Sequence, residues 1–326
     1  MAKATKNSKD LVSLEPKKDQ FMGFWFQDSI EFVPGCTLNV KIKDFLCRTR
    51  SKFQDIWVVE TQGLGRMLVI DGVTMLTEFD EFAYHEMISH VPLLVHPRPS
   101  RVLVIGGGDG GVVREVLKHR EVESVHLCEI DVEVVNVCRE YLPSQASSLN
   151  DPRVKIFYED GAKFAANHPG SYEVIIVDST DPFGPGQVLF QKPFFHSVKK
   201  ALTRHGIAVT QCESIYLHRH VIEGVFSFAR KLYPVTGYYF TVVPTYPSGL
   251  IGFSFCSLGR DPIKDIDEER AKRLRDLRYY STEIHRGSFA LPRFASGFIG
   301  GPACGYRVNP ERNEEGKACD HDNRSS

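Results

Sequence analysis

The sequence predicts an α/β protein in which a small N-terminal antiparallel β-domain precedes a Rossmann-like domain with a mostly parallel sheet. Three observations support this prediction. Residues from about 25 to 76 carry strand and turn signals. Beyond residue 100, short apolar runs alternate with helix-like stretches. A glycine-rich turn follows the first of these runs, at the position where Rossmann-like folds bind a ligand.

Length and composition are ordinary for a protein of this class. The chain has 326 residues, 42% hydrophobic and 25% charged, with 40 basic and 41 acidic side chains. A net charge of −1 does not favour nucleic acid or an anionic membrane as a partner. No apolar run is long enough for a signal peptide or a bilayer span. We therefore expect a soluble, cytoplasmic protein.

The eight cysteines contain no C-x-x-C pair, and several lie in apolar runs such as SVHLCEI and GFSFCSL. This pattern is typical of free thiols in a reducing compartment, and it does not favour a zinc site or a disulfide framework. We expect no metal in this protein.

Changes in composition and residue pattern divide the chain into four parts. Residues 1–20 are polar and are expected to form a loose leader. Residues 21–77 contain TLNVKIKDFL, QDIWVVET and RMLVIDG, which predict the β-domain. Residues 78–299 are expected to form the Rossmann-like catalytic domain. Residues 300–326 have almost no aliphatic side chains, so a disordered tail is expected there, and removal of residues 301–326 should leave folding and turnover nearly unchanged.

The predicted large domain alternates strands with helices. The apolar runs RVLVIGG, SVHLCEID, VKIFYED, YEVIIVDST and GIAVTQC are predicted to be strands buried on both faces of a parallel sheet. Helices are predicted for EFDEFAYHEMISHVPLLVH before them and for GVVREVLKHR, DVEVVNVCREYL and FFHSVKKALTRH between them. Near the end, YYFTVVPTYPSGLIGFSFCSL predicts an antiparallel hairpin that closes the sheet.

The glycine-rich turn is a candidate ligand site. Gly106, Gly108 and Gly111 fit G-x-G-x-x-G between a strand and a helix, where close approach of a ligand requires residues without a Cβ. Enzymes that bind NAD and enzymes that bind S-adenosylmethionine both satisfy this pattern, and a merely tight turn is the alternative. Glu129 follows 129 − 106 = 23 residues later, where a carboxylate can bind ribose hydroxyls. Asp160 ends the third strand, where an adenine amino group could be bound.

Asp109 distinguishes between these ligands because it lies inside the glycine loop. A carboxylate there would repel a pyrophosphate and attract a cation, which disfavours NAD and favours a sulfonium or an amine. The alternative is that Asp109 only caps the helix that follows.

Two further carboxylates, Asp178 and Asp181, follow the fourth strand. With Asp109, Glu129 and Asp160 they make an acidic edge suited to a polycation, although either residue could simply organise a turn. Aromatic faces attract ammonium groups, and the candidates outside the core are Trp25, Tyr84 and Tyr246.

The order of these motifs resembles the spermidine synthase family. The matching segments are GGGDGGVVREV, CEID, EDGAKF, VDSTDPFGPG, QCES and VPTYPSGLIGF, and the resemblance runs from about Gly23 to Phe294. It implies a transfer of the aminopropyl group of decarboxylated S-adenosylmethionine to putrescine, which yields spermidine and methylthioadenosine. The nucleoside compound would be a co-substrate, and no cofactor is expected.

The resemblance also implies roles for individual residues. The donor would be held by Gln54, His85, Gly106, Gly108, Asp109, Glu129, Asp160 and Gly161. The diamine would be held by Tyr84, Asp178, Asp181 and Tyr246, with Asp178 as the proton acceptor. Trp25 and Gln211 match positions near the diamine, residues 178–190 match a loop that covers the substrates, and the family is usually homodimeric.

The chain departs from the family pattern at four positions. Val33 stands where the family commonly has tryptophan, Cys36 and Met75 stand where it has glutamine, and Thr180 stands where it has serine. Met75 removes a hydrogen-bonding side chain near the expected adenosyl group. The rival interpretations are a diamine N-methyltransferase on the same fold, a catalytically silent regulatory paralogue and, more distantly, an NAD oxidoreductase. Asp109 argues against the first and third of these, and the retained Asp178, Asp181 and Tyr84 argue against the second.

Overall fold

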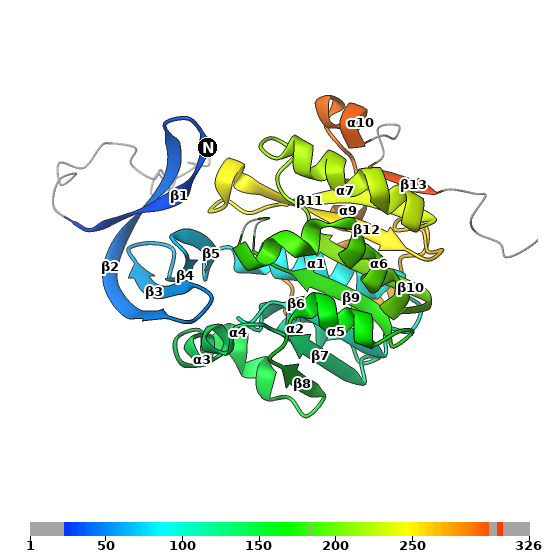
Figure 1. The fold of residues 1–326 in the computed structure, drawn as a ribbon, viewed down its shortest axis with the longest axis horizontal. Coiled ribbons are helices and arrows are strands. Elements are labelled where there is room, and N and C mark those ends of the chain that lie inside the picture. The colour runs from blue at the N-terminus through cyan, green and yellow to red at the C-terminus, as the bar shows by residue number, and fades with distance from the viewer. Residues whose placement is uncertain (1–22, 181, 183, 300–304, 309–326) are drawn as a thin grey trace, which may run out of the picture.

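The computed structural model describes residues 23–180, 182, 184–299 and 305–308, which form two sheets (Figure 1). The first is an antiparallel five-stranded sheet in which each strand pairs with the next along the chain. Most of the buried residues of β3 alternate with half-buried ones, which gives this sheet one more closely packed face. Its strands are β1 (Trp25–Val33), β2 (Cys36–Arg50), β3 (Asp55–Thr61), β4 (Arg66–Ile70) and β5 (Val73–Thr77).

The second sheet has eight strands in the order β13-β11-β12-β10-β9-β6-β7-β8. Strands β10, β9, β6, β7 and β8 are parallel to one another, whereas β12, β11 and β13 are added antiparallel beside β10. The strands are β6 (Arg101–Gly106), β7 (Ser124–Cys128), β8 (Val154–Phe157), β9 (Tyr172–Asp178), β10 (Leu202–Gln211), β11 (Val235–Val242), β12 (Leu250–Ser257) and β13 (Tyr306–Val308).

The chain order reverses beside β6. From β6 it proceeds outward to β7 and β8, then returns to β9 on the other side of β6. Gly106 and Asp178 are direct partners at the carboxyl ends of β6 and β9. Such a reversal opens a crevice where α/β sheets bind their ligands, so the fold itself marks the region around Gly106 as a site.

Helices cover both faces of this sheet. Figure 1 shows α5, α6 and α7 side by side on one face, and α1 and α2 pack together on the other. The helices are α1 (Glu81–Val95), α2 (Gly111–Val116), α3 (Val132–Tyr141), α4 (Pro143–Ala146), α5 (Gly161–Asn167), α6 (Lys192–Ala201), α7 (Arg219–Leu232), α8 (Glu268–Arg273), α9 (Thr282–Ser288) and α10 (Arg293–Ile299), with short 3₁₀ turns η1 (Ser147–Asn150), η2 (Gly184–Phe190) and η3 (Pro247–Gly249).

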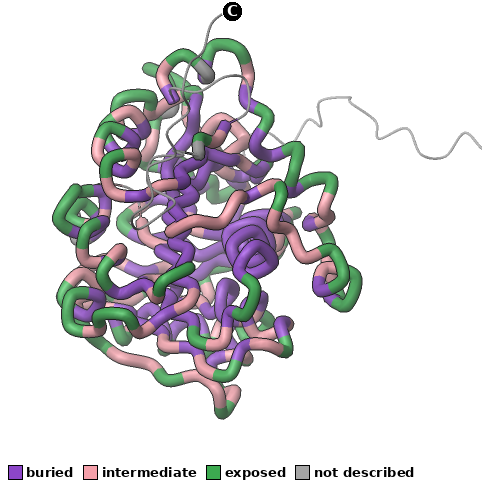
Figure 2. The backbone as a smooth tube through the Cα atoms, turned by 90° about the vertical axis from the view of Figure 1, so that its right-hand side faces the viewer, coloured by how far each residue is buried: buried purple, intermediate pink, exposed green. Residues whose placement is uncertain are grey.

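The core follows from strand periodicity. Val102 and Val104 of β6 point to the face that α1 and α2 cover, while Leu103 and Ile105 point to the opposite face. All four side chains are buried, as expected for a strand covered on both sides. Figure 2 shows the same distribution, with buried segments gathered in the centre and exposed segments around the rim.

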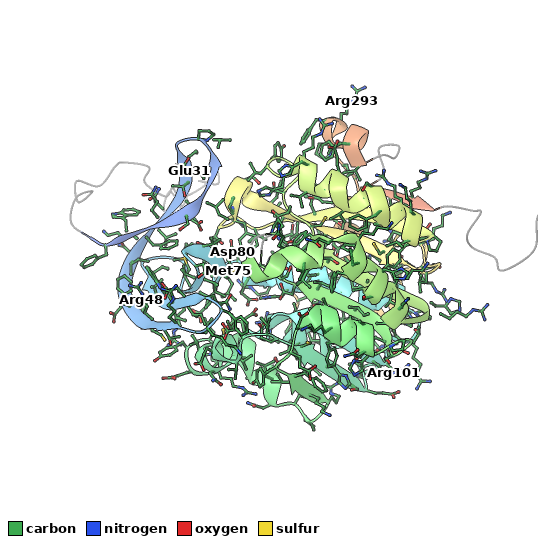
Figure 3. All side chains as sticks on the ribbon, viewed as in Figure 1. Glu31, Arg48, Met75, Asp80, Arg101 and Arg293 are labelled. Carbon is green, nitrogen blue, oxygen red and sulfur yellow. The ribbon has the colours of Figure 1, made fainter. Side chains whose placement is uncertain are left out.

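Asp80 joins the start of α1 to a distant loop. Its carboxylate accepts hydrogen bonds from the Thr77 hydroxyl at 2.7 Å and from the backbone N–H of Thr245 at 2.8 Å. Asp80 and Met75 both lie where the small sheet meets the large domain (Figure 3). These bonds fix the N-terminal turn of α1, the helix that carries the predicted site residues Tyr84 and His85.

The end of the chain corrects one prediction. The expected disordered tail from residue 300 is wrong for Gly305–Val308, because β13 pairs with Val235–Gly237 of β11. The Gly305 backbone N–H also donates to the Phe289 carbonyl at 2.6 Å, and Tyr306 packs against the Phe289 ring. An edge strand is held by hydrogen bonds of its backbone, so a segment with few aliphatic residues can still be ordered. Residues 1–20, 300–304 and 309–326 lie outside the described part of the chain.

The predicted fold class is confirmed: a small antiparallel β-domain precedes a Rossmann-like, mostly parallel sheet. The hairpin predicted near the end is formed by β11 and β12. Among the helices of the described residues, none is sufficiently long and apolar to span a bilayer. The cysteines in this part of the chain are free thiols, of which Cys36 is exposed and Cys128 is buried.

Candidate active site

A cavity of about 380 Å³ lies between the small sheet and the carboxyl edge of the large sheet. The small sheet contributes apolar side chains such as Leu68, Ile70 and Val73, and the large domain contributes the polar groups. Most residues predicted from the sequence line this one cavity: Gln54, Tyr84, His85, Gly106, Gly108, Asp109, Glu129, Asp160, Gly161, Asp178, Gln211 and Tyr246.

The glycine loop allows the floor of the cavity to be close-packed. Gly106 has φ +77°, and a Cβ there would clash with the Asp178 carbonyl oxygen. A Cβ at Gly111 would clash with the His85 ring, and one at Gly161 would clash with Ile105. The glycines therefore bring the ends of neighbouring strands and α1 together around one space.

The Asp109 side chain makes a hydrogen bond within the glycine loop and also faces the cavity. Its Oδ1 accepts the Gly111 backbone N–H at 2.7 Å, so the capping interpretation is partly correct. The same oxygen lies 3.3 Å from His85 Nε2, so the carboxylate also faces a cation across the cavity floor. The first residue of α2 is preceded by Gly110, which has φ +86° and no side-chain cap. Asp109 is thus a site residue as well as a turn residue.

Asp178 ends β9 and is held by Tyr84, whose hydroxyl donates to Asp178 Oδ1 at 2.6 Å. Burial and the neighbouring Asp109 carboxylate raise the pKa of Asp178 to about 6, although His85 and the Tyr84 hydrogen bond oppose this. Burial and the Asp178 charge raise the pKa of Tyr84 well above its usual value. At neutral pH Asp178 is therefore mostly ionised and able to accept a proton, while Tyr84 remains a donor.

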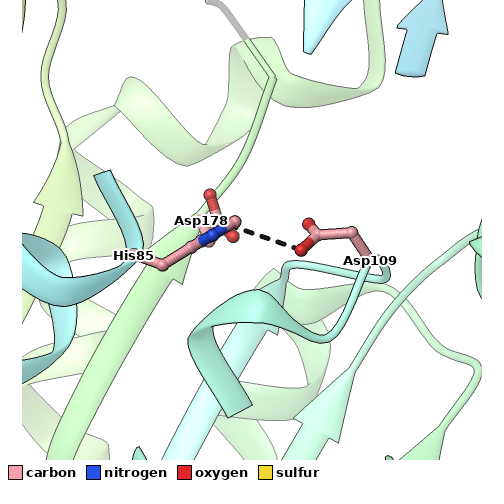
Figure 4. Close-up of side chains that lie close together, drawn as sticks. All are labelled: His85, Asp109 and Asp178. Carbon is pink, nitrogen blue, oxygen red and sulfur yellow. Dashed lines mark ion pairs between the residues drawn. The ribbon is translucent and has the colours of Figure 1, made fainter. Parts of the chain in front are cut away.

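His85 lies between the carboxylates of Glu81 and Asp109, and Figure 4 shows its contact with Asp109. Its Nδ1 is 2.5 Å from Glu81 Oε2, and its Nε2 faces Asp109. Burial disfavours the charged ring, but Asp109 and the hydrogen bond with Glu81 outweigh it and raise the pKa of His85 to about 9. His85 is therefore an imidazolium at neutral pH.

The end of the cavity at β6, β7 and β8 carries two further carboxylates, Glu129 and Asp160. Glu129 Oε1 accepts the Asp131 backbone N–H at 2.9 Å, and Gly108 leaves room beside Glu129 Oε2. Burial and nearby carboxylates raise the pKa of Glu129 to about 7 despite this hydrogen bond. Asp160 caps α5 through Oδ1 alone, at 2.8 Å from the Ala162 N–H. Gln54 reaches the same end and donates to Asp131 Oδ2 at 2.9 Å.

The opposite end of the cavity is formed by loops from the antiparallel strands. The Tyr246 hydroxyl donates to the Met75 carbonyl at 2.6 Å, which packs the Tyr246 ring beside Tyr84. Met75 lines the cavity, and its backbone oxygen accepts this hydrogen bond. The methionine at this position therefore still contributes to the cavity wall. Gln211 ends β10 and is buried at this end.

Sequence reasoning missed one carboxylate. Glu213 lines the cavity, is 1% exposed and adopts φ +64°, a strained conformation for a non-glycine residue. Its Oε2 lies 2.6 Å from His218 Nδ1. The signal was present in the QCES segment, but no periodicity distinguishes a buried carboxylate in a loop from a solvated one.

The structure does not bring one predicted residue to the cavity, and it does not describe another. Trp25 is 53% exposed at the start of β1 and is absent from the lining, so its predicted substrate contact finds no support here. Asp181 lies outside the described residues, and its predicted role stays a prediction. Thr180, next to it, does line the cavity.

One group of described side chains has the spacing of metal ligands. His85, Asp109 and Asp178 each offer an atom within 4.8 Å of the other two. A metal ligand requires a neutral imidazole with a free nitrogen, whereas both nitrogens of His85 face carboxylates and the ring is protonated. The arrangement suits an ion-pair cluster better than a metal site.

The fold and the cavity define a class of protein: a Rossmann-like enzyme whose carboxylates receive a cationic small molecule at the reversal of strand order. Comparison with known proteins places the chain more narrowly. Residues 81–264 match the spermine/spermidine synthase domain, and residues 24–78 match the spermidine synthase tetramerisation domain.

Individual relatives agree with this match. The chain is 48% identical over 278 residues to a polyamine aminopropyltransferase of Leptospira biflexa, covering 85% of this chain and 99% of the relative. It is 45% identical over 281 residues to a spermidine synthase of Dictyostelium discoideum, covering 85% of this chain and 98% of the relative.

Solved structures agree as well. A spermidine synthase in complex with the transition-state analogue AdoDATO superimposes with a TM-score of 0.83 at 38% identity, covering 88% of this chain and 97% of that one. The spermidine synthase from Thermotoga maritima gives 0.80 at 35% identity, covering 91% and 99%. The chain belongs to the spermidine synthase family, which confirms the resemblance of its motifs.

Proposed function

We propose that this protein transfers an aminopropyl group from decarboxylated S-adenosylmethionine to putrescine, forming spermidine and methylthioadenosine. One observation carries the proposal: Asp109, in the loop after β6, and Asp178, at the end of the adjacent β9, face one cavity, where they can serve as a cation site and a proton acceptor side by side. The membership of the family supports the same reaction.

The donor would occupy the end of the cavity at β6, β7 and β8. Glu129 would accept the ribose hydroxyls, and Asp160 with Gly161 would meet the adenine. Gly106 and Gly108 allow the backbone to approach, while Gln54 closes the small-domain side. Asp109 and His85 would lie at the amine of the aminopropyl arm, with the carboxylate pairing that cation.

The diamine would lie between Tyr84, Asp178, Tyr246 and Gln211. An amine of this kind has a pKa near that of lysine, about 10.4, and arrives protonated. Asp178 accepts one proton from the ammonium that Tyr84 helps to orient. The freed nitrogen lone pair forms the new C–N bond, the C–S bond breaks, and its electron pair stays on sulfur as neutral methylthioadenosine leaves. Positioning and proton removal are the contributions of the protein.

The distal ammonium requires a second anion. Asp181 remains the predicted anchor, and Glu213 is a second carboxylate available at that end, oriented by His218. The chemistry needs no metal or redox cofactor, because the sulfonium is already a good leaving group. A diamine N-methyltransferase is disfavoured, since the intact donor would place its carboxylate against Asp109.

We also propose that the enzyme is a homodimer in the cytoplasm. The match of residues 24–78 to a tetramerisation domain supports self-association. The free cysteines of the described residues suit a reducing compartment. Light scattering on the purified chain tests the assembly, since a dimer has twice the 36.8 kDa mass of the chain.

The decisive experiment is mass spectrometry of the products formed from each combination of donor and amine. Spermidine and methylthioadenosine should appear only with the decarboxylated donor and putrescine. A methylated diamine formed from intact S-adenosylmethionine would favour the rival methyltransferase. The absence of product from every combination would favour a catalytically silent protein.

A further inference from the structure

A chain of alternating charges leads from the cavity floor into the helices behind it. It begins at Asp109, passes through His85 and Glu81 on α1, and continues to Arg114 and Glu115 on α2. His85 and Glu81 are one helical turn apart and therefore share a face of α1. Asp109 lies in the glycine loop, Glu81 and His85 in α1, and Arg114 and Glu115 in α2. Glu81 and Arg114 have no role in the reaction proposed above.

Glu81 is buried, with 7% of its surface exposed, and both oxygens of its carboxylate are bound by neighbouring side chains. Arg114 binds both its oxygens, with Nη1 at 3.0 Å from Oε1 and Nη2 at 2.8 Å from Oε2. Gln145 Nε2 donates to Oε1 at 3.2 Å, and His85 Nδ1 meets Oε2. A bidentate guanidinium fixes the plane of the carboxylate, so Glu81 presents its remaining lone pair to His85 in one direction.

This fixation orients the His85 ring. With Nδ1 bound to Glu81, Nε2 is directed at Asp109 Oδ1, 3.3 Å away (Figure 4). The ring packs against Gly111, where a Cβ would clash with it, and it is 3% exposed. A flipped or rotated ring would lose both carboxylate contacts, so the cation has one position at the cavity floor.

We propose that Glu81 is a positioning residue for the transfer: fastened by Arg114, it holds His85 as the cation that faces Asp109 and Asp178. This inference rests on the proposed function for its kinetic consequence, but its structural part concerns the charge of His85 alone. The imidazolium offsets the repulsion between two carboxylates that share the cavity floor. It thereby keeps Asp178 ionised and able to receive the substrate proton.

The charged and titratable groups around this pair define the pH effect. Glu81 and Tyr84 face it from α1, Asp109 from the glycine loop, and Arg114 from α2. Glu129 adds negative charge from the end of β7. His85 contacts the carboxylates of Glu81 and Asp109. Removing the Glu81 charge takes away one of these anions while the Arg114 cation remains nearby, so the pKa of His85 falls. Without the imidazolium, Asp109 raises the pKa of Asp178 further.

The test compares Glu81→Gln with Glu115→Gln. Both variants remove a buried carboxylate bound to Arg114, but only Glu81 contacts His85. We expect both to lower the melting temperature. Only Glu81→Gln should move the acidic limb of the kcat profile upward, by about one pH unit, the shift typical of losing one nearby opposite charge. Its loss of rate at neutral pH should be recovered at higher pH, which a purely structural defect would not allow.

Three further measurements keep the inference open to contradiction. Glu81→Asp retains the charge and should retain most of the wild-type pH limb. His85→Gln should shift the limb as Glu81→Gln does, and the double variant should shift it no further. NMR titration of the His85 ring in the wild type, assigned by its loss in His85→Gln, should show a protonated ring at neutral pH.

The outcomes separate this inference from the proposed function. If the wild type forms no spermidine, the proposed function fails, while the NMR titration still reports the charge of His85. If spermidine is formed and His85 is neutral at pH 7 in the wild type, the inference is wrong. An unchanged acidic limb in folded Glu81→Gln, or an equal shift in Glu115→Gln, would also overturn it.

Discussion

The Tyr84 hydroxyl donates a 2.6 Å hydrogen bond to Asp178 Oδ1 across 94 residues of sequence. Tyr84 comes from the first turns of α1, and Asp178 is the last residue of β9. The bond stabilises the ionised carboxylate against burial and against Asp109. It joins the helix that carries the cation to the strand that carries the proposed base, and it explains why the cavity depends on several distant segments at once.

Asp178→Asn should lower turnover by about 10²–10⁴-fold at saturating substrates, because an amide cannot accept the proton. Asp181→Asn should mainly raise KM for putrescine, because it would weaken binding of the distal ammonium. Steady-state kinetics on both variants measure the contrast. Asp151→Asn, which removes a surface carboxylate paired with Arg153, serves as the control. Near-normal turnover of Asp178→Asn would show that another group is the base, and Tyr84 would be the first candidate to test.

Asp178→Asn should also raise the free energy of unfolding of the substrate-free protein at neutral pH. The pKa of Asp178 is about 6 in the folded protein against an ordinary value of 3.8, so folding favours the protonated form. This stability is fully present below about pH 4 and is lost as pH rises through about 6. Asp178→Asn should therefore gain about 1–2 kcal/mol at pH 7.5 and nothing at pH 4. Urea unfolding at both pH values measures this, and a destabilised variant at pH 7.5 would contradict it.

Asp109→Asn should weaken the choice between donors. The carboxylate would pair with the amine of decarboxylated S-adenosylmethionine and repel the carboxylate of the intact compound. We expect the wild type to bind the decarboxylated donor far better than the intact one. The variant should reduce the ratio of the two dissociation constants by about tenfold or more. Titration calorimetry with both compounds provides the measurement. Equal affinities for the two donors in the wild type would show that Asp109 does not select between them.

Gly106→Ala should destabilise the fold and abolish activity. Gly106 has φ +77°, and an added Cβ would clash with the Asp178 backbone carbonyl, which cannot move without displacing β9. Gly224→Ala is the matched control, since Gly224 lies in α7 with open space around it. That control should gain about 0.5–1 kcal/mol from helix propensity. Thermal unfolding of both variants checks the pair, and similar melting temperatures would show that the loop tolerates a side chain.

Deletion of residues 305–326 should lower the melting temperature, contrary to the expectation from composition. It removes β13 and the Gly305 bonds to Tyr238 and Phe289. A second truncation that removes only residues 309–326 isolates the contribution of the strand. The difference in melting temperature between the two truncations measures it. If the two proteins melt together, β13 contributes nothing to the stability of the sheet.

Local patterns predicted the architecture because they are properties of short segments. Strand and turn signals identified the small sheet, short apolar runs identified the large sheet, and the glycine loop identified the predicted ligand-binding turn at Gly106. Carboxylates after successive strands could be assigned to one site because parallel strands end at the same edge of a sheet. The boundary of α6 was less predictable: its helical pattern continues to His205, yet Leu202 already pairs with Tyr172 in the sheet.

Long-range contacts required the tertiary structure. The sequence by itself determined the fold class, the acidic edge and the identity of Asp109 and Asp178 as its central residues. Only the folded chain decided that Glu81 binds Arg114 and His85, that Glu213 enters the cavity, that Trp25 stays outside it and that Tyr306–Val308 form a strand. The physical reason is that a charge or an edge strand is defined by its partners, and those partners are brought close by packing between helices and sheets rather than by spacing along the chain.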